Sequence, residues 1–278
     1  MRLGGPILKD CPDPESWIAA LRKADYSAAY CPVTADAGDD VVRAYADAAR
    51  KADLVIAEVG AWSNPLSPNE DERRAALEKC RTQLALADRI GAFCCVNISG
   101  SRGEQWDGHH ADNLTSDTFD MIVEVVRGIV DEVKPTRTFY TLETMPWMYP
   151  DSAESYLRLI EAIDRPRFAV HFDPVNLVNS PARYYSTGEL IRHFIVTLGP
   201  HIKSCHAKDV LLRPGFITHL DEVRPGLGNL DYGAFLREFD KLGSDIPVML
   251  EHLSTEEEYG SAAEYVRSVA QKEGVTIR

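Results

Sequence analysis

The chain alternates between short apolar runs rich in β-branched residues and longer stretches in which apolar positions recur every three to four residues. The short runs predict strands, and the longer stretches predict amphipathic helices. The predicted strands are residues 2–6, 28–31, 54–59, 93–98, 138–143, 168–173, 202–206 and 247–251. Helical stretches follow the strands, among them 39–51, 70–89, 116–133, 152–163 and 232–242. Eight strand–helix units are the number that closes a (β/α)8 TIM barrel.

Turn and cap signals agree with one domain that covers residues 1–278. Ser152 can cap a helix, Gly243 can end one, and no linker of changed composition divides the chain. The main competitor is an open doubly wound sheet, which would need a glycine-rich phosphate turn after its first strand. The chain contains no G-x-G-x-x-G motif, and we interpret Gly226-Leu227-Gly228 as a simple turn. We therefore predict an α/β protein with a single (β/α)8 TIM barrel.

Composition and charge indicate which binding partners and which cell compartment to expect. The 278 residues carry 30 Lys and Arg against 43 Asp and Glu, a net charge of −13, with no basic run. Such a surface repels phosphate backbones and anionic lipid, so we expect neither a nucleic-acid nor a membrane partner. The six cysteines form no C-x-x-C pair and indicate reduced thiols. No secretory signal or long apolar segment is present, so we expect a cytoplasmic protein.

The last residues of four successive predicted strands are of the kind that bind metal ions. These residues are Glu143, Asp173, His206 and Glu251. Catalytic groups of such barrels lie at the C-terminal ends of the strands, and residues two apart on a strand share a face, so all four can face inward together. Three crowded carboxylates would repel one another unless a positive charge lies among them. A divalent cation is the simplest such charge.

The donor types suggest both the metal and the reaction. Three carboxylates and one imidazole favour one hard or borderline ion, with Mn²⁺ as first choice, Mg²⁺ or Co²⁺ next, and Zn²⁺ as a further possibility. Such an ion chelates neighbouring hydroxyl and carbonyl oxygens, the pattern of a ketose. Glu143 and Glu251 can flank the substrate as an acid/base pair that moves a proton next to the polarised carbonyl. Returning the proton on the other face would epimerise the sugar, and returning it to the next carbon would isomerise it.

These residues also resemble a known family, the xylose isomerase-like TIM barrels, a group of sugar isomerases and epimerases. The similar segments are 142–144, 171–176, 204–209, 225–232 and 250–252. In D-tagatose 3-epimerase-like members a Glu, Asp, His, Glu quartet holds the metal and the two Glu exchange the proton. The resemblance assigns these roles to Glu143, Asp173, His206 and Glu251. It also implies a dimer or tetramer.

Two positions differ from the ketose epimerases of this family. Asn176 is found where many of them have a substrate-contacting His, and Leu212 is found where they have Arg. With Asn176 and the His-x-Lys-Asp sequence at 206–209, the chain more closely resembles the L-xylulose 5-phosphate 3-epimerase group. We therefore count Asn176 among the substrate-binding candidates, and the substrate could be phosphorylated.

Further candidates lie in the loops above the predicted barrel mouth. Three tryptophans follow successive strands and could cover the apolar face of a sugar or simply pack under the loops: Trp62, Trp106 and Trp147. Arg102 and Arg224 could bind a phosphate or carboxylate, although surface ion pairs are an equal alternative. Asp209 could orient the substrate. His171 shares the strand face of the metal-binding Asp and could hydrogen-bond to a metal ligand from the layer below.

Several functions use these parts. A sugar isomerase or epimerase is the first hypothesis. A hydro-lyase of the inosose dehydratase or 3-keto-glycoside type would remove the same proton and then expel an oxygen. An endonuclease IV-like repair enzyme shares the fold but needs three zinc ions and a basic groove, which the charge of −13 disfavours. A non-enzymatic sugar-binding barrel with a vestigial metal site is the fourth.

Overall fold

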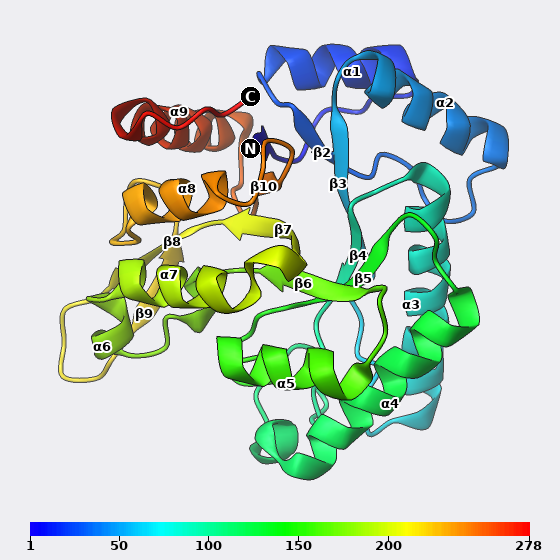
Figure 1. Cartoon of the computed structure of the whole chain (residues 1–278), viewed down its shortest axis with the longest axis vertical. Helices are drawn as coiled ribbons and strands as arrows, with labels where there is room; N and C mark the ends of the chain where they lie inside the picture. The colour runs from blue at the N-terminus through cyan, green and yellow to red at the C-terminus, as the bar shows by residue number, and fades with distance from the viewer.

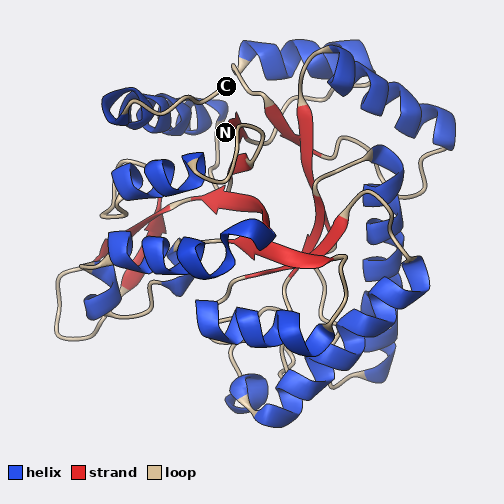
Figure 2. Ribbon diagram, in the orientation of Figure 1, coloured by secondary structure: helices blue, strands red, loops and turns tan.

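The computed structural model describes residues 1–278 and contains a closed barrel of eight parallel strands (Figures 1 and 2). Their order around the barrel is β1-β10-β7-β6-β5-β4-β3-β2. The bounds are β1 Arg2–Gly4, β2 Ala28–Tyr30, β3 Val55–Gly60, β4 Cys94–Asn97, β5 Phe139–Glu143, β6 Phe168–Phe172, β7 Ile202–Ala207 and β10 Pro247–Leu250. Each predicted strand overlaps one of these, so the predicted (β/α)8 barrel is confirmed.

Helices surround the strands on the outside of the barrel (Figure 2). They are α1 Pro14–Lys23, α2 Asp39–Lys51, α3 Glu70–Ile90, α4 Ser116–Val133, α5 Ala153–Ile163, α6 Pro181–Tyr184, α7 Thr187–Leu198, α8 Tyr232–Asp240 and α9 Glu256–Glu273. Short 3₁₀ turns cover Ala111–Leu114, Val175–Leu177 and Gly199–His201. The Ser152 side chain accepts a hydrogen bond from the Ser155 amide, which confirms the predicted cap of α5. No helix is both long enough and apolar enough to cross a membrane.

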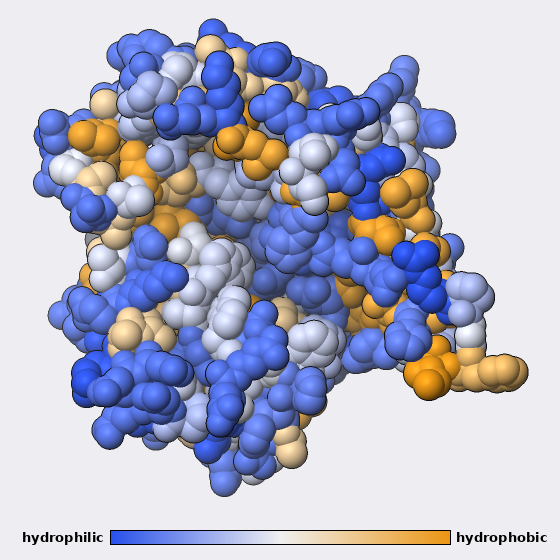
Figure 3. All heavy atoms as spheres, turned by 180° about the vertical axis from the view of Figure 1, so that it is seen from behind, coloured by the Kyte–Doolittle hydropathy of each residue, from blue (hydrophilic) through white to orange (hydrophobic).

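An antiparallel hairpin interrupts the strand–helix alternation between β7 and α8. Its strands are β8 Asp209–Leu212 and β9 Leu220–Val223. The sequence pattern does not indicate this hairpin, because its strands have four residues each and neither alternates strictly between polar and apolar positions. Its tip projects at the lower right of Figure 3, and Phe216 and Ile217 at that tip are exposed. The hairpin starts three residues after His206, so it borders the barrel mouth.

The interior of the barrel changes from apolar to polar toward the C-terminal ends of the strands. Ala28, Ala57 and Met249 form a small apolar cluster inside it. A Cβ at Gly4 would lie 2.4 Å from the Ala28 carbonyl oxygen, so only glycine fits there. Nearer the mouth the buried residues are polar and titratable. All six cysteines are free thiols, as the sequence indicated.

Candidate metal centre

The four predicted strand-end residues come together at the C-terminal mouth of the barrel. Glu143 ends β5, His206 lies near the end of β7, and Asp173 and Glu251 directly follow β6 and β10. The His206 Nδ1 atom is 2.8 Å from Glu143 Oε1 and 2.9 Å from Glu251 Oε1. The same nitrogen is 3.7 Å from Asp173 Oδ2. One donor atom from each residue lies within 4.8 Å of the others, so the four groups share a common centre.

The spacing and the free donor atoms of this cluster fit a divalent ion. Neighbouring ligands of an octahedral ion with bonds of about 2.1 Å are about 3 Å apart, close to two of the three separations from His206 Nδ1. Asp173 Oδ2 and Glu251 Oε1 are buried and accept no well-formed hydrogen bond. Buried carboxylate oxygens normally have a partner, and the only partners near these two are cationic groups, as a metal-binding position requires.

The loop after β6 determines which oxygen of Asp173 faces the centre. Asp173 Oδ1 accepts the backbone N–H groups of Val175 and Asn176, at 2.9 and 3.3 Å. This leaves Oδ2 for the cluster. The Thr144 hydroxyl donates to the Asp173 carbonyl and accepts its N–H, which ties the end of β6 to the end of β5. The Asn176 side chain donates to Glu143 Oε1 at 3.3 Å. The predicted substrate residue Asn176 therefore lies at the centre.

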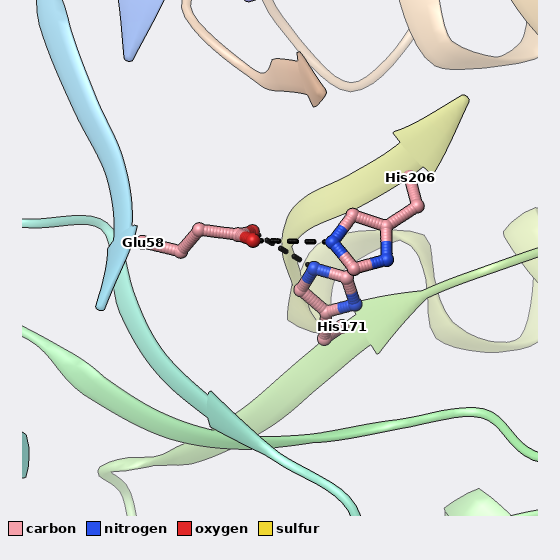
Figure 4. A group of neighbouring side chains, drawn as sticks. All are labelled: Glu58, His171 and His206. Atoms are coloured by element: carbon pink, nitrogen blue, oxygen red, sulfur yellow. Dashed lines mark hydrogen bonds and ion pairs between the residues drawn. The ribbon is translucent and has the colours of Figure 1, made fainter. Parts of the chain in front are cut away.

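Glu58 on β3 fixes the orientation of His206 from beneath (Figure 4). Its carboxylate is 3.1 Å from His206 Nε2 and 2.9 Å from His171 Nε2, and it accepts the Ser204 hydroxyl at 2.9 Å. With Nε2 donating to Glu58, His206 presents Nδ1 to the three other donors, an arrangement typical of metal-binding histidines. Burial alone would raise the pKa of Glu58, but the two imidazoles hold it well below its usual range.

The pKa values of the four residues in the cluster are shifted in different directions. Burial alone would raise the pKa of Asp173 and Glu251, but His206 and Lys208 lower both, that of Glu251 to about 2. For Glu143 burial outweighs the same cations and raises the pKa. Burial opposes the charge of His206, yet the surrounding carboxylates raise the pKa of this imidazole well above its usual value. Among the three carboxyls of the cluster only Glu143 has a raised pKa, and burial is its cause.

Lys208 brings a positive charge into the same cluster. Its side chain is 2 % exposed, and its ammonium is 2.9 Å from Asp173 Oδ2 and also pairs with Glu251. Glu143 Oε1 lies 3.8 Å from the ammonium, and Glu222 Oε2 on β9 lies 3.5 Å from it. The positive charge that the crowded carboxylates need is therefore supplied in this structure by the Lys208 ammonium.

The chain that forms this site is similar to a known protein family. The family model described as xylose isomerase-like TIM barrel matches residues 7–269, which include all four strand-end residues. The chain belongs to the xylose isomerase-like TIM barrel family. No curated protein is significantly similar to it in sequence.

Several solved structures share the whole fold. D-psicose 3-epimerase with D-tagatose from Clostridium cellulolyticum H10 has a TM-score of 0.67 at 15% identity, over 97% of this chain and 99% of that one. The probable 3-DHS dehydratase AsbF from Bacillus anthracis has a TM-score of 0.71 at 14% identity, over 96% and 99%. A xylose isomerase-like TIM barrel protein from Mycobacterium smegmatis in complex with magnesium has a TM-score of 0.68 at 16% identity, over 97% and 95%. These identities show a common fold.

The three predicted tryptophans lie at different depths of this xylose isomerase-like barrel. The Trp62 ring is 6.4 Å from the His206 ring, between centroids, and packs against Met145. Trp106 and Trp147 are 41% and 42% exposed, and the Trp147 indole donates to the Asp107 carbonyl. Trp62 therefore adjoins the metal centre, whereas the other two stand in exposed loop positions.

The structure does not bring three other predicted substrate residues to the centre. The Arg102 guanidinium donates to the Thr118 hydroxyl on α4 at 3.1 Å. Arg224 Nη1 has the neighbouring Pro225 carbonyl as its partner, at 3.5 Å. The Asp209 carboxylate is occupied by four backbone N–H groups, those of Val210, Gly226, Gly228 and Leu230. In each case local hydrogen bonds of the loop hold the side chain.

Two residues of the site were missed or underused in the sequence analysis. Glu58 lies one residue before the predicted end of strand 54–59 and is the only charged residue in that strand. A single carboxylate in a fully buried strand is a signal that could have been used. Lys208 lies two residues after His206, so strand parity places both on one face. His171, predicted to support the ligands from below, lies with its ring centroid 4.2 Å from that of His206.

Proposed function

We propose that this protein is a divalent-metal-dependent isomerase or epimerase that acts on a ketose or related keto-sugar. The observation that carries the proposal is the convergence of Glu143, Asp173, His206 and Glu251 on one centre at the barrel mouth. Membership of the xylose isomerase-like family and the fold shared with a D-psicose 3-epimerase support it.

The four converging residues would hold the ion. Three carboxylates and an imidazole fit Mn²⁺ first, then Mg²⁺ or Co²⁺, with Zn²⁺ also possible. When bound, the ion would supply Lewis-acid polarisation of a substrate carbonyl. Glu58 would keep His206 Nδ1 free to bind, and Asn176 would hold the Glu143 carboxylate in place through its 3.3 Å hydrogen bond.

Glu143 and Glu251 would exchange the substrate proton. They project from β5 and from the end of β10, which β6 and β7 separate in the barrel, so they approach the centre from two sides. One carboxylate would remove the proton next to the carbonyl and the other would deliver one to the opposite face, which inverts that carbon. The raised pKa of Glu143, which burial causes, suits a group that must accept a proton and release it again. Trp62 would exclude water above His206.

A hydro-lyase is the second candidate, favoured by the fold shared with a probable 3-DHS dehydratase. It would use the same proton abstraction and then expel a hydroxyl or alkoxyl group from the neighbouring carbon. The substrate class would be an inosose or a 3-keto-glycoside. We also propose a sugar as the small-molecule partner and a homodimer or homotetramer as the assembly.

Incubation with keto-sugars in deuterated water distinguishes these functions. D-tagatose, D-psicose and D-fructose, with their phosphates, would be supplied to Mn²⁺-loaded protein and followed by NMR and mass spectrometry. Deuterium next to the carbonyl with no loss of water supports the isomerase or epimerase, whereas a dehydrated product supports the hydro-lyase. Glu143→Gln and Glu251→Gln should each slow exchange by roughly 10²- to 10⁴-fold. Glu154→Gln, which alters an exposed carboxylate, is the matched control. Equal exchange in all three variants would contradict the proposal.

A further inference from the structure

Lys208 is the one group at the metal centre that the proposed chemistry leaves without a role. It lies directly after β7 with its side chain 2 % exposed, and its ammonium is within 4.0 Å of four carboxylates. A lysine is rarely this deeply buried unless it is paired. Its position therefore reflects the carboxylates around it.

The ammonium uses the same oxygen atoms that would bind the ion. Lys208 Nζ lies 2.9 Å from Asp173 Oδ2 and also pairs with Glu251 Oε1. These are the two buried oxygens that accept no well-formed hydrogen bond and that face His206 Nδ1. A divalent ion and an ammonium cannot share these oxygens, because two cations about 3 Å apart repel each other strongly in a buried site.

The backbone at Lys208 and the next residue is held by hydrogen bonds, so the side chain is the part that can move. The Lys208 carbonyl accepts the Tyr232 hydroxyl at 2.8 Å. The next residue, Asp209, accepts four backbone N–H bonds at 2.8–3.0 Å. A flexible four-carbon side chain on a fixed backbone can move its charge by changing rotamer.

Glu222 offers the displaced ammonium a second partner. Its Oε2 atom lies 3.5 Å from Lys208 Nζ, and Glu222 is not one of the four converging residues. It belongs to β9 of the hairpin, and its side chain is 34% exposed. The His252 Nδ1 atom lies 3.0 Å from Glu222 Oε1 and 3.2 Å from Glu222 Oε2, so this carboxylate contacts both the imidazole and the ammonium. The ammonium thus lies between the carboxylates of the metal centre, Asp173 and Glu251, and the Glu222 carboxylate on the hairpin.

We propose that Lys208 is a built-in counter-cation that occupies the metal position in the metal-free protein and swings toward Glu222 when a divalent ion binds. The inference rests on the proposed metal site and adds a competitor to it. Lys208 would stabilise the metal-free fold by neutralising the carboxylates. It would also weaken metal binding, because the ion must first displace it.

Two measurements on the metal-free 278-residue chain test whether Lys208 competes with the ion. They are calorimetric titration with Mn²⁺ and the midpoint of thermal unfolding. Lys208→Met should bind Mn²⁺ about tenfold more tightly than wild type or better, because no cation has to be displaced. Its metal-free midpoint should fall by roughly 10 °C, because three carboxylates lose their counter-charge. Glu222→Gln should bind Mn²⁺ about threefold more weakly, because the displaced ammonium loses its outer acceptor.

Lys203→Met is the matched control, because it removes the same charge from β7, the strand that Lys208 directly follows. The Lys203 ammonium contacts the Pro200 carbonyl and the Phe139 ring, not the metal centre. It should bind Mn²⁺ as wild type does. If Lys208→Met does not fold without metal, the Mn²⁺ affinity of Glu222→Gln still tests the inference. This variant should fold, because the Glu222 side chain is partly exposed.

The outcomes separate this inference from the proposed function. If wild type binds Mn²⁺ and Lys208→Met binds it equally or more weakly, Lys208 is not a competitor and the metal site remains. Unchanged affinity in Glu222→Gln would likewise overturn the outward swing. If wild type and every variant bind neither Mn²⁺ nor Mg²⁺, Co²⁺ or Zn²⁺, the metal-dependent function fails and this inference fails with it.

Discussion

Replacement of Glu58 by Gln is the sharpest test of how the metal centre is held. The Glu58 carboxylate is 1% exposed and accepts from His171, His206 and Ser204 at 2.9–3.1 Å. Gln keeps the shape but replaces one acceptor oxygen by an NH₂ donor. One of the two imidazole N–H groups then faces a donor inside a buried site.

The size of the effect follows from these contacts. Breaking one partner of a buried charged pair costs about 3–5 kcal/mol. In a chain of this length 1 kcal/mol corresponds to about 2–4 °C, so the midpoint of the metal-free protein should fall by roughly 10 °C. The His206 ring also loses the partner that keeps Nδ1 available, and loss of such a carboxylate lowers metal affinity by about 10- to 100-fold.

Thermal unfolding of the metal-free protein and calorimetric titration with Mn²⁺ measure the two effects. Glu154→Gln is the control, because Glu154 also pairs with a histidine, His193, but both side chains are exposed. Exposed pairs contribute at most about 1 kcal/mol, so this variant should resemble wild type in both assays. If Glu58→Gln does not fold, Ser204→Ala removes one neutral hydrogen bond from the same carboxylate, and a midpoint a few degrees lower is expected. Glu58→Gln with the stability and Mn²⁺ affinity of the control would refute the positioning role.

Two further predictions concern the scaffold. Burial alone would raise the pKa of Asp88, but the N–H groups of residues 136–138 hold it below its usual range. Its contribution, about 1 kcal/mol once solvent screening of this partly exposed carboxyl is counted, is therefore complete above an unfolded pKa of about 3.9 and is lost as pH falls through the folded value. The urea stability difference between wild type and Asp88→Ala should shrink below pH about 4; a difference independent of pH would be inconsistent with this. Tyr156→Phe removes a buried hydroxyl that joins β5 to β6 through Leu142 and His171, and should cost about 1–3 kcal/mol in urea unfolding. Unchanged stability would show that this hydroxyl contributes nothing.

The barrel could be predicted because its determinants are local. Most of the buried parallel strands are short apolar runs, and most of the helices have their own period and a side-chain cap, as at Ser152. The four strand-end residues could be predicted for the same reason, because parity and strand position specify where a side chain points. The hairpin was missed because four-residue strands such as Asp209–Leu212 carry almost no period.

The remaining parts of the site depend on contacts between distant segments. Glu58 meets His206 across 148 positions of the chain. The long side chains of Arg102 and Arg224 reach partners that loop conformation selects. Strand parity alone could have placed Lys208 on the face of His206, but only the structure shows that its ammonium meets four carboxylates, which lie on or directly after β5, β6, β9 and β10.

Elemental analysis of wild type and Asp173→Asn, each loaded with Mn²⁺ and dialysed, tests whether the four converging residues bind one divalent ion. Asp173 supplies a buried oxygen to the common centre, so its replacement removes a ligand with little change of shape. We expect about one equivalent of manganese per wild-type chain and almost none in the variant. No metal in the wild type, equal metal in both proteins, or three equivalents of zinc in the protein as purified would contradict it.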